Sequence, residues 1–164
     1  MSLSSKLPVH HILLADDDND DCTLFRDALD DLPLATHLTT VRNGEQLMQL
    51  LNKNEELPDL LFLDLNMPRK NGFECLSEIK QDGKLRLIPV IIISTSFEPD
   101  IVNLLYRQGA RHYIRKPNVY AQLVKVIHNA ITLTSQGNLS QPLEEEFVLS
   151  PPSFYTEAVA GKTH

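Results

Sequence analysis

Apolar residues gather in five short runs along the chain, and the polar stretches between the runs repeat their apolar positions at helical spacing. Three of the runs are continuously apolar, which is typical of strands that are covered on both faces of a parallel sheet. The runs, which predict five strands, are residues 11–15, 38–41, 60–63, 90–93 and 113–114.

The stretches between the runs predict five amphipathic helices, each with one apolar face. We expect every such face to pack into the core rather than to bind a cofactor. The faces are formed by Cys22, Phe25, Ala28, Leu29 and Leu32; by Leu47, Met48, Leu50 and Leu51; by Phe73, Leu76 and Ile79; by Ile101, Leu104 and Leu105; and by Leu123, Val126, Ile127, Ala130 and Ile131.

Strict alternation of strands and helices with short links predicts parallel strands joined by right-handed crossovers. We therefore expect one doubly wound α/β domain over residues 8–134. Residues 135–164 show no helical period, and we expect a flexible tail there. The alternative is a segment that docks on this chain or on a partner through its apolar residues, which are Phe147, Val148, Leu149, Phe154 and Tyr155.

The formal net charge of −7 argues against duplex DNA as a direct partner, because affinity for nucleic acid comes mainly from basic residues. Cys22 and Cys75 show no metal-ligand or disulfide spacing, so we expect them to be reduced and buried in a cytoplasmic protein. No apolar run reaches membrane-spanning length and no signal peptide is recognisable, so we expect no membrane association.

Polar side chains stand directly after four of the five predicted strands. In an open α/β sheet, these positions meet at the edge where ligands bind. Taken singly, each residue has an ordinary explanation as a turn, a helix cap or a solvated charge, and Asp18 is a candidate cap. The residues are Asp16, Asp17 and Asp18 after the first strand, Asp64 after the third, Ser94 and Thr95 after the fourth, and Lys116 after the fifth.

The combination of these groups predicts a site for a divalent metal ion and a phosphoryl group. Clustered carboxylates repel one another, and a hard cation such as Mg²⁺ removes the conflict. A metal ion held by Asp17 and Asp64, with Asp16 acting partly through water, leaves one Asp64 oxygen free to attack phosphorus. Lys116 would supply a second positive charge, and Ser94 a hydroxyl donor.

At this point the motifs resemble the receiver domain of two-component response regulators, over roughly residues 10–133. The resemblance implies a flavodoxin-like (βα)5 fold with a parallel five-stranded sheet in the order 2-1-3-4-5. The motifs are Ile12-Leu13-Leu14-Ala15-Asp16-Asp17-Asp18, Leu63-Asp64-Leu65-Asn66-Met67-Pro68 followed by Gly72, Pro89-Val90-Ile91-Ile92-Ile93-Ser94, and Tyr113-Ile114-Arg115-Lys116-Pro117.

The resemblance also implies a role for each residue. Asp16 and Asp17 would bind Mg²⁺ or Mn²⁺ together with Asp64 and the backbone carbonyl of Asn66, and Asp64 would accept the phosphoryl group. Lys116 would bind the phosphate, with a cis bond to Pro117. Ser94 would be the switch hydroxyl and Tyr113 the rotating switch aromatic, for which the alternative is a strand-edge tyrosine with its hydroxyl in water.

The implied function is phosphorelay signalling by a single-domain switch that catalyses only its own phosphorylation and dephosphorylation. The implied partners are a sensor histidine kinase and a downstream protein or phosphotransfer partner, with a homodimer as a further option. Asn66-Met67 and Arg69-Lys70-Asn71 before Gly72 resemble the small receivers that act with phytochrome-type kinases.

Three other functions remain as alternatives. A haloacid-dehalogenase-like phosphatase needs a second aspartate two residues after the nucleophile, where this chain has Asn66. A flavin-binding module needs a phosphate-cradling loop after the first strand, where three carboxylates would repel the anionic cofactor. A degenerate receiver could act as a scaffold, although all the catalytic positions are filled.

Overall fold

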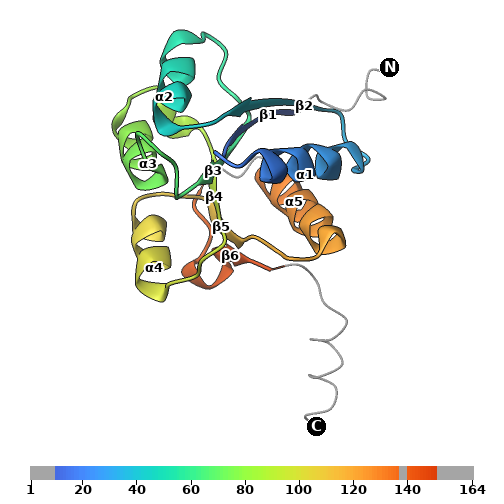
Figure 1. The fold of residues 1–164 in the computed structure, drawn as a ribbon. Coiled ribbons are helices and arrows are strands. Elements are labelled where there is room, and N and C mark those ends of the chain that lie inside the picture. The colour runs from blue at the N-terminus through green and yellow to red at the C-terminus, as the bar shows by residue number, and fades with distance from the viewer. Residues whose placement is uncertain (1–9, 137–139, 151–164) are drawn as a thin grey trace, which may run out of the picture.

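The computed structural model describes residues 10–136 and 140–150, and its centre is one parallel sheet (Figure 1). The strand order is β2-β1-β3-β4-β5-β6, so the predicted order 2-1-3-4-5 is confirmed and a sixth strand extends it. The strands are β1 His10–Ala15, β2 Thr36–Val41, β3 Leu60–Asp64, β4 Val90–Ser94, β5 His112–Arg115 and β6 Val148–Leu149.

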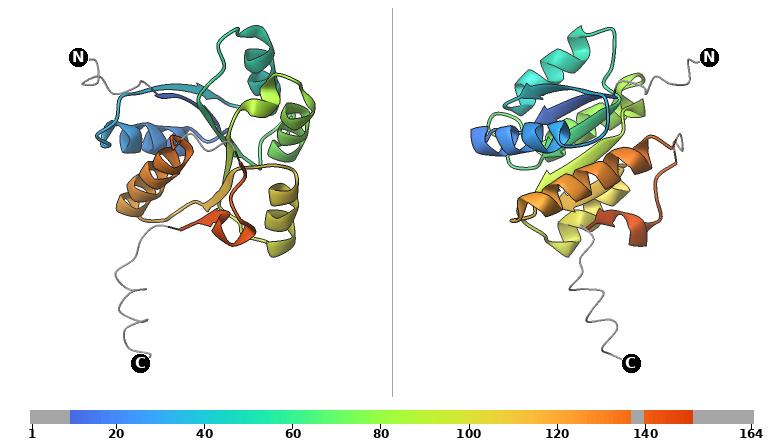
Figure 2. Two further views of the ribbon diagram at one scale, coloured as in Figure 1. Left: turned by 180° about the vertical axis from the view of Figure 1, so that it is seen from behind. Right: turned by 90° about the vertical axis from the view of Figure 1, so that its right-hand side faces the viewer.

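Helices cover both faces of the sheet, as a doubly wound fold requires. Figures 1 and 2 show α1 and α5 together on one face, and α2, α3 and α4 on the other. The helices are α1 Asn19–Asp30, α2 Gly44–Lys53, α3 Gly72–Gln81, α4 Pro99–Arg107 and α5 Tyr120–Thr134, with short 3-10 turns at Leu85–Leu87 and Glu144–Glu146.

The continuously apolar strands supply side chains to two separate cores. Successive residues of a strand point to opposite faces, so Leu61 contacts the layer of α2, α3 and α4, whereas Phe62 contacts the layer of α1 and α5. In β4, Ile92 likewise contacts the layer of α2, α3 and α4, whereas Ile91 contacts the layer of α1 and α5. Burial on both faces explains why these runs do not alternate with polar residues.

One predicted core position is wrong. Leu104 of α4 is 39% exposed, although its spacing in the sequence predicts that it lies on the apolar face of this helix. Val102 and Leu105, which are three residues apart, are the buried residues of α4, and Ile101 is partly buried. Leu104 lies two residues from Val102, which is more than half a helical turn, so its side chain falls at the edge of the buried face rather than on it.

The described part of the C-terminal segment packs against β5. Phe147 is 1% exposed, and its ring meets the ring of Tyr106 edge to face at 5.1 Å between centroids. Phe147 joins the core under α4, whereas Leu149 joins the core under α5, so β6 closes both layers at this edge. Phe154 and Tyr155, also considered for docking, lie outside the described residues.

Candidate functional site

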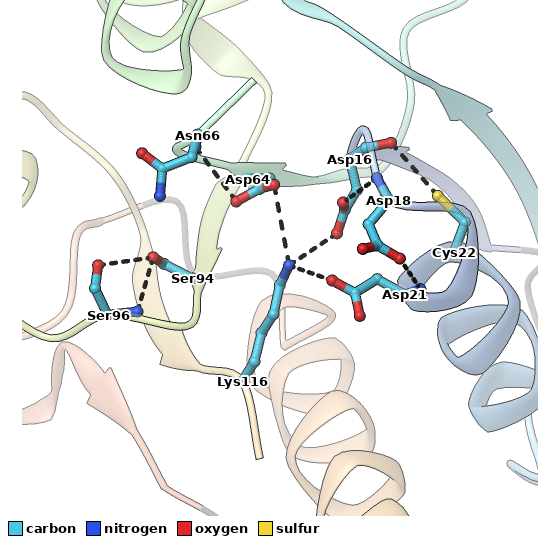
Figure 3. Close-up of polar contacts among 9 residues, drawn as sticks. All are labelled: Asp16, Asp18, Asp21, Cys22, Asp64, Asn66, Ser94, Ser96 and Lys116. Carbon is cyan, nitrogen blue, oxygen red and sulfur yellow. Dashed lines mark hydrogen bonds and ion pairs between the residues drawn. The ribbon is translucent and has the colours of Figure 1, made fainter. Parts of the chain in front are cut away.

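The ends of β1, β3, β4 and β5 meet at one edge of the sheet and bring the candidate residues together (Figure 3). β1 pairs with β2 on one side and with β3 on the other, so the strand order reverses between β1 and β3. A doubly wound fold forms its ligand crevice at this point. Asp16 directly follows β1, and Asp64 is the last residue of β3.

Three carboxylates form the centre of the site. One carboxylate oxygen from each of Asp16, Asp17 and Asp64 lies within 4.8 Å of the others. Asp16 and Asp64 are buried, whereas Asp17 is exposed, so the group opens toward solvent on the Asp17 side. Two buried carboxylates next to a third one are costly unless a cation balances them.

Local hydrogen bonds set the turn between β1 and α1. Asp16 Oδ1 accepts a bond of 2.9 Å from the backbone N–H of Asp18. Asp18 in turn caps α1, because its Oδ1 accepts a bond of 3.0 Å from the backbone N–H of Asp21. The proposal that Asp18 is a helix cap is therefore confirmed, and the cap keeps Asp18 out of the three-carboxylate group.

The loop after β3 is drawn tightly against the end of the strand. The backbone N–H of Asn66 points to Asp64 Oδ1 at 3.4 Å, and Gly72 N donates a bond of 2.9 Å to the Leu65 carbonyl. A Cβ atom at position 72 would lie 2.5 Å from the carbonyl oxygen of Asp64. Only glycine permits this approach, so Gly72 helps to fix the backbone that carries Asp64 and Asn66.

Lys116 reaches the site from the end of β5. Its Nζ donates hydrogen bonds of 2.7 Å to Asp21 Oδ2 and 3.0 Å to Asp16 Oδ2, and it lies 3.9 Å from Asp64 Oδ2. The expected cis bond between Lys116 and Pro117 is wrong, because the described residues contain no cis peptide bond. The two isomers of such a bond differ little in free energy, so the surrounding structure decides between them.

The buried charges perturb one another. Burial raises the pKa of Asp64 from 3.8 to about 6, although the nearby Lys116 charge acts in the opposite direction. Burial also raises the pKa of Asp16, against the hydrogen bond from Asp18 and the charge of Lys116. Burial alone would lower the pKa of Lys116, but its bond to Asp21 and the charges of Asp64 and Asp16 raise it.

Ser94 and Tyr113 are linked through the loop after β4. Ser94 is fully buried, and its Oγ lies 3.2 Å from the hydroxyl of Ser96 and accepts a bond from the Ser96 backbone N–H. Tyr113 is also fully buried, and its hydroxyl donates to the carbonyl oxygen of Ser96. The alternative of a strand-edge tyrosine with its hydroxyl in water is therefore wrong.

The structure adds one residue that the sequence did not single out. Asp21 is not among the residues that directly follow a predicted strand, yet it makes the shortest contact of Lys116. The sequence does contain a signal, because Asp21 belongs to the acidic run that begins at Asp16, directly after the first strand. Nothing in the sequence shows, however, that Lys116 lies opposite.

The donor set fits a hard divalent cation. All three side chains offer carboxylate oxygens, which Mg²⁺ and Mn²⁺ prefer over nitrogen or sulfur. Asp64 and Asp16 are buried with only Lys116 as a nearby cation among the described residues. This arrangement is the one expected of a phosphoacceptor domain of the flavodoxin-like class.

Comparisons with known proteins agree with this class. A family model, the response regulator receiver domain, matches residues 12–128. Response regulator Rcp1 from Synechocystis sp. is 34% identical over 125 residues, which cover 73% of this chain and 85% of Rcp1. The chain therefore belongs to the response regulator receiver family, and it is a receiver domain of two-component phosphorelay signalling.

Two solved structures show the same architecture. The phosphorylated cyanobacterial phytochrome response regulator RcpA has a TM-score of 0.73 at 32% identity, covering 80% of this chain and 97% of that chain. The Mn²⁺-bound form of response regulator Rcp1 has a TM-score of 0.70 at 30% identity, covering 81% and 99%. In the part of the chain that the structure describes, no helix is long and apolar enough to cross a membrane.

Proposed function

We propose that Asp64 accepts a phosphoryl group from a phosphohistidine of a sensor histidine kinase. The observation that carries this assignment is the position of Asp64, whose buried carboxylate lies in the three-carboxylate group and 3.9 Å from the Lys116 ammonium. Asp16, Asp17, Asp64 and the backbone carbonyl of Asn66 would hold Mg²⁺ or Mn²⁺. The bound ion would neutralise charge on the transferring phosphoryl oxygens.

The transfer itself needs little covalent chemistry from the protein. One Asp64 oxygen forms a bond to phosphorus while the P–N bond to the kinase imidazole breaks, and the imidazole leaves with the electron pair. Lys116 stabilises the negative charge on the phosphoryl oxygens, and Ser94 donates its hydroxyl to one of them. In dephosphorylation, water attacks the same phosphorus while its bond to the Asp64 oxygen breaks, which restores the Asp64 carboxylate and releases inorganic phosphate. Both reactions would take place on the chain's own Asp64, so the chain would act catalytically only on itself.

The signal would leave the site through the loop after β4. Ser94 contacts Ser96, and Ser96 contacts the Tyr113 hydroxyl, so movement of Ser94 toward the phosphoryl group would disturb the position of Tyr113. We propose that this change alters the surface of α4, β5 and α5 in a cytoplasmic protein. The phytochrome-related proteins among its structural relatives support a phytochrome-type kinase as the partner.

The strands and helices that position the site also define the domain division. We propose that residues 8–134 form the switching domain and that residues 135–164 are an addition to it. The partner downstream is a target protein, a phosphotransfer protein or a second copy of the chain. Measuring the molecular mass in solution with and without phosphorylation distinguishes the last of these from the other two.

The first experiment measures the intact mass after incubation with acetyl phosphate, with and without Mg²⁺. We expect a gain of one phosphoryl group that depends on Mg²⁺ and is absent in Asp64→Asn. The matched control is Asp59→Asn, a change of the same kind at an exposed residue before β3. If the native chain gains no mass under any condition, or if Asp64→Asn gains as much as the native chain, the assignment is wrong.

A further inference from the structure

The Lys116 ammonium contacts three carboxylates, and the nearest belongs to Asp21 rather than to Asp64. Lys116 Nζ lies 2.7 Å from Asp21 Oδ2, compared with 3.0 Å for Asp16 and 3.9 Å for Asp64. Asp21 is outside the group of three carboxylates that fits a metal ion. Its contact with Lys116 therefore calls for an explanation other than metal binding.

Asp21 is held in place by the start of α1. Its backbone N–H donates to the capping carboxylate of Asp18, which fixes the first turn of the helix. Its side chain is 36% exposed, and that of Lys116 is 15% exposed, so the pair lies at the rim of the site. Figure 3 shows Lys116 extending between Asp64 on one side and Asp16 and Asp21 on the other.

This position makes Asp21 a competitor for the ammonium. A phosphoryl group on Asp64 needs Lys116 as a charge partner, yet Lys116 is bonded to Asp21 and is not within hydrogen-bond distance of Asp64. Asp16, the other bonded carboxylate, belongs to the metal-binding group, whereas Asp21 lies outside that group and is paired with Lys116 among the described residues. The charge of Asp21 also repels an anion that enters the site.

We propose that Asp21 is a positioning residue that retains the Lys116 ammonium at the rim of the site and competes with the phosphoryl group for it. The inference rests on the proposed role of Asp64 as phosphoacceptor. It assigns to this chain a built-in restraint on phosphorylation, whose strength is set by one hydrogen-bonded ion pair between α1 and the end of β5.

The test measures the affinity of the full chain for beryllofluoride, a mimic of the phosphoryl group, at saturating Mg²⁺. Loss of one partly exposed, hydrogen-bonded ion pair should lower the dissociation constant of Asp21→Asn about three- to tenfold. Asp20→Asn is the matched control, because it removes the same charge from an exposed neighbour in the same helical turn. Asp21→Glu keeps the carboxylate and should stay close to the native affinity.

A second measurement requires neither metal ion nor beryllofluoride. Hydrogen exchange at the Lys116 ammonium, followed by ¹⁵N NMR, should be equally slow in the native chain and in Asp20→Asn, and faster in Asp21→Asn, which keeps only the hydrogen bond to Asp16. A purely structural role for Asp21 would not accelerate exchange at Lys116 while strengthening the binding of the mimic.

The outcomes separate the two proposals. If the native chain fails to bind beryllofluoride, the proposed function fails and this inference falls with it. If the native chain binds the mimic but Asp21→Asn binds it no more tightly than Asp20→Asn, or more weakly, the inference alone is overturned. Exchange at Lys116 in Asp21→Asn as slow as in the native chain would overturn it as well.

Discussion

The backbone N–H of Tyr113 donates a hydrogen bond of 3.1 Å to the carbonyl oxygen of Phe147. The same carbonyl lies 3.1 Å from Nδ1 of the buried His112. The sixth strand is therefore attached to β5 at the residue whose side chain reaches the loop after β4. Phe147 and Tyr113 also belong to the same hydrophobic core, so the C-terminal segment is joined to the strand of Tyr113 by both backbone bonding and packing.

Replacing Phe147 with alanine should destabilise the native chain. The side chain is 1% exposed and belongs to the core under α4, and truncation of such a phenylalanine typically costs about 3–5 kcal/mol. The free energy of unfolding in urea measures the loss. Leu143→Ala, in the same segment but 61% exposed, should leave it nearly unchanged. Equal effects of the two changes would show that Phe147 is not docked.

Removing the hydroxyl of Tyr113 should weaken the link to the loop after β4. Tyr113→Phe loses the hydrogen bond to the Ser96 carbonyl, and we expect a loss of stability of about 1 kcal/mol with phosphorylation by acetyl phosphate retained. Urea unfolding and intact mass measure the two quantities. Tyr120→Phe, whose hydroxyl contacts Asp31 at the surface, is the control and should cost less. Loss of phosphorylation in Tyr113→Phe would contradict a role downstream of Asp64.

Mg²⁺ should stabilise the folded chain. A ligand that binds only the folded state at about 100 times its dissociation constant adds about 2.7 kcal/mol to the free energy of unfolding. Asp17→Asn should remove this gain, because Asp17 supplies one of the three carboxylates. Asp18→Asn should keep it, since asparagine caps a helix as well as aspartate does. The site would need reassignment if both variants lost the gain equally.

Stability without added metal should depend on pH through Asp64. Its pKa is raised to about 6 from 3.8, so its contribution to stability is fully present below about pH 4 and is lost as pH rises through 6. Asp64→Asn has no such loss, so at pH 8 it should gain about 2–3 kcal/mol relative to the native chain, compared with pH 4. Urea unfolding at both values, with Asp20→Asn as control, measures the difference. A constant difference between Asp64→Asn and the native chain would contradict the raised pKa.

The sequence by itself determined the alternation of elements and most of the site. Apolar patterning is a local property, so β3 and β4 could be recognised as continuous apolar runs, and the apolar face of α1 from its helical spacing. Residues that follow parallel strands must meet at one sheet edge, which is why the sequence placed Asp16, Asp64, Ser94 and Lys116 together. The strand order came from the family motifs.

Only the tertiary structure decided which distant groups are in contact. Asp21 and Lys116 are 95 residues apart, and no local pattern reveals that the first turn of α1 faces the end of β5. The two-residue strand β6 is too short to show periodicity, and it forms because Phe147 and Leu149 fill space at the edge of both cores. The exposure of Leu104 also depends on how α4 packs on the sheet. The bond before Pro117 is trans, and because the local preference between its isomers is weak, the surrounding structure selects between them.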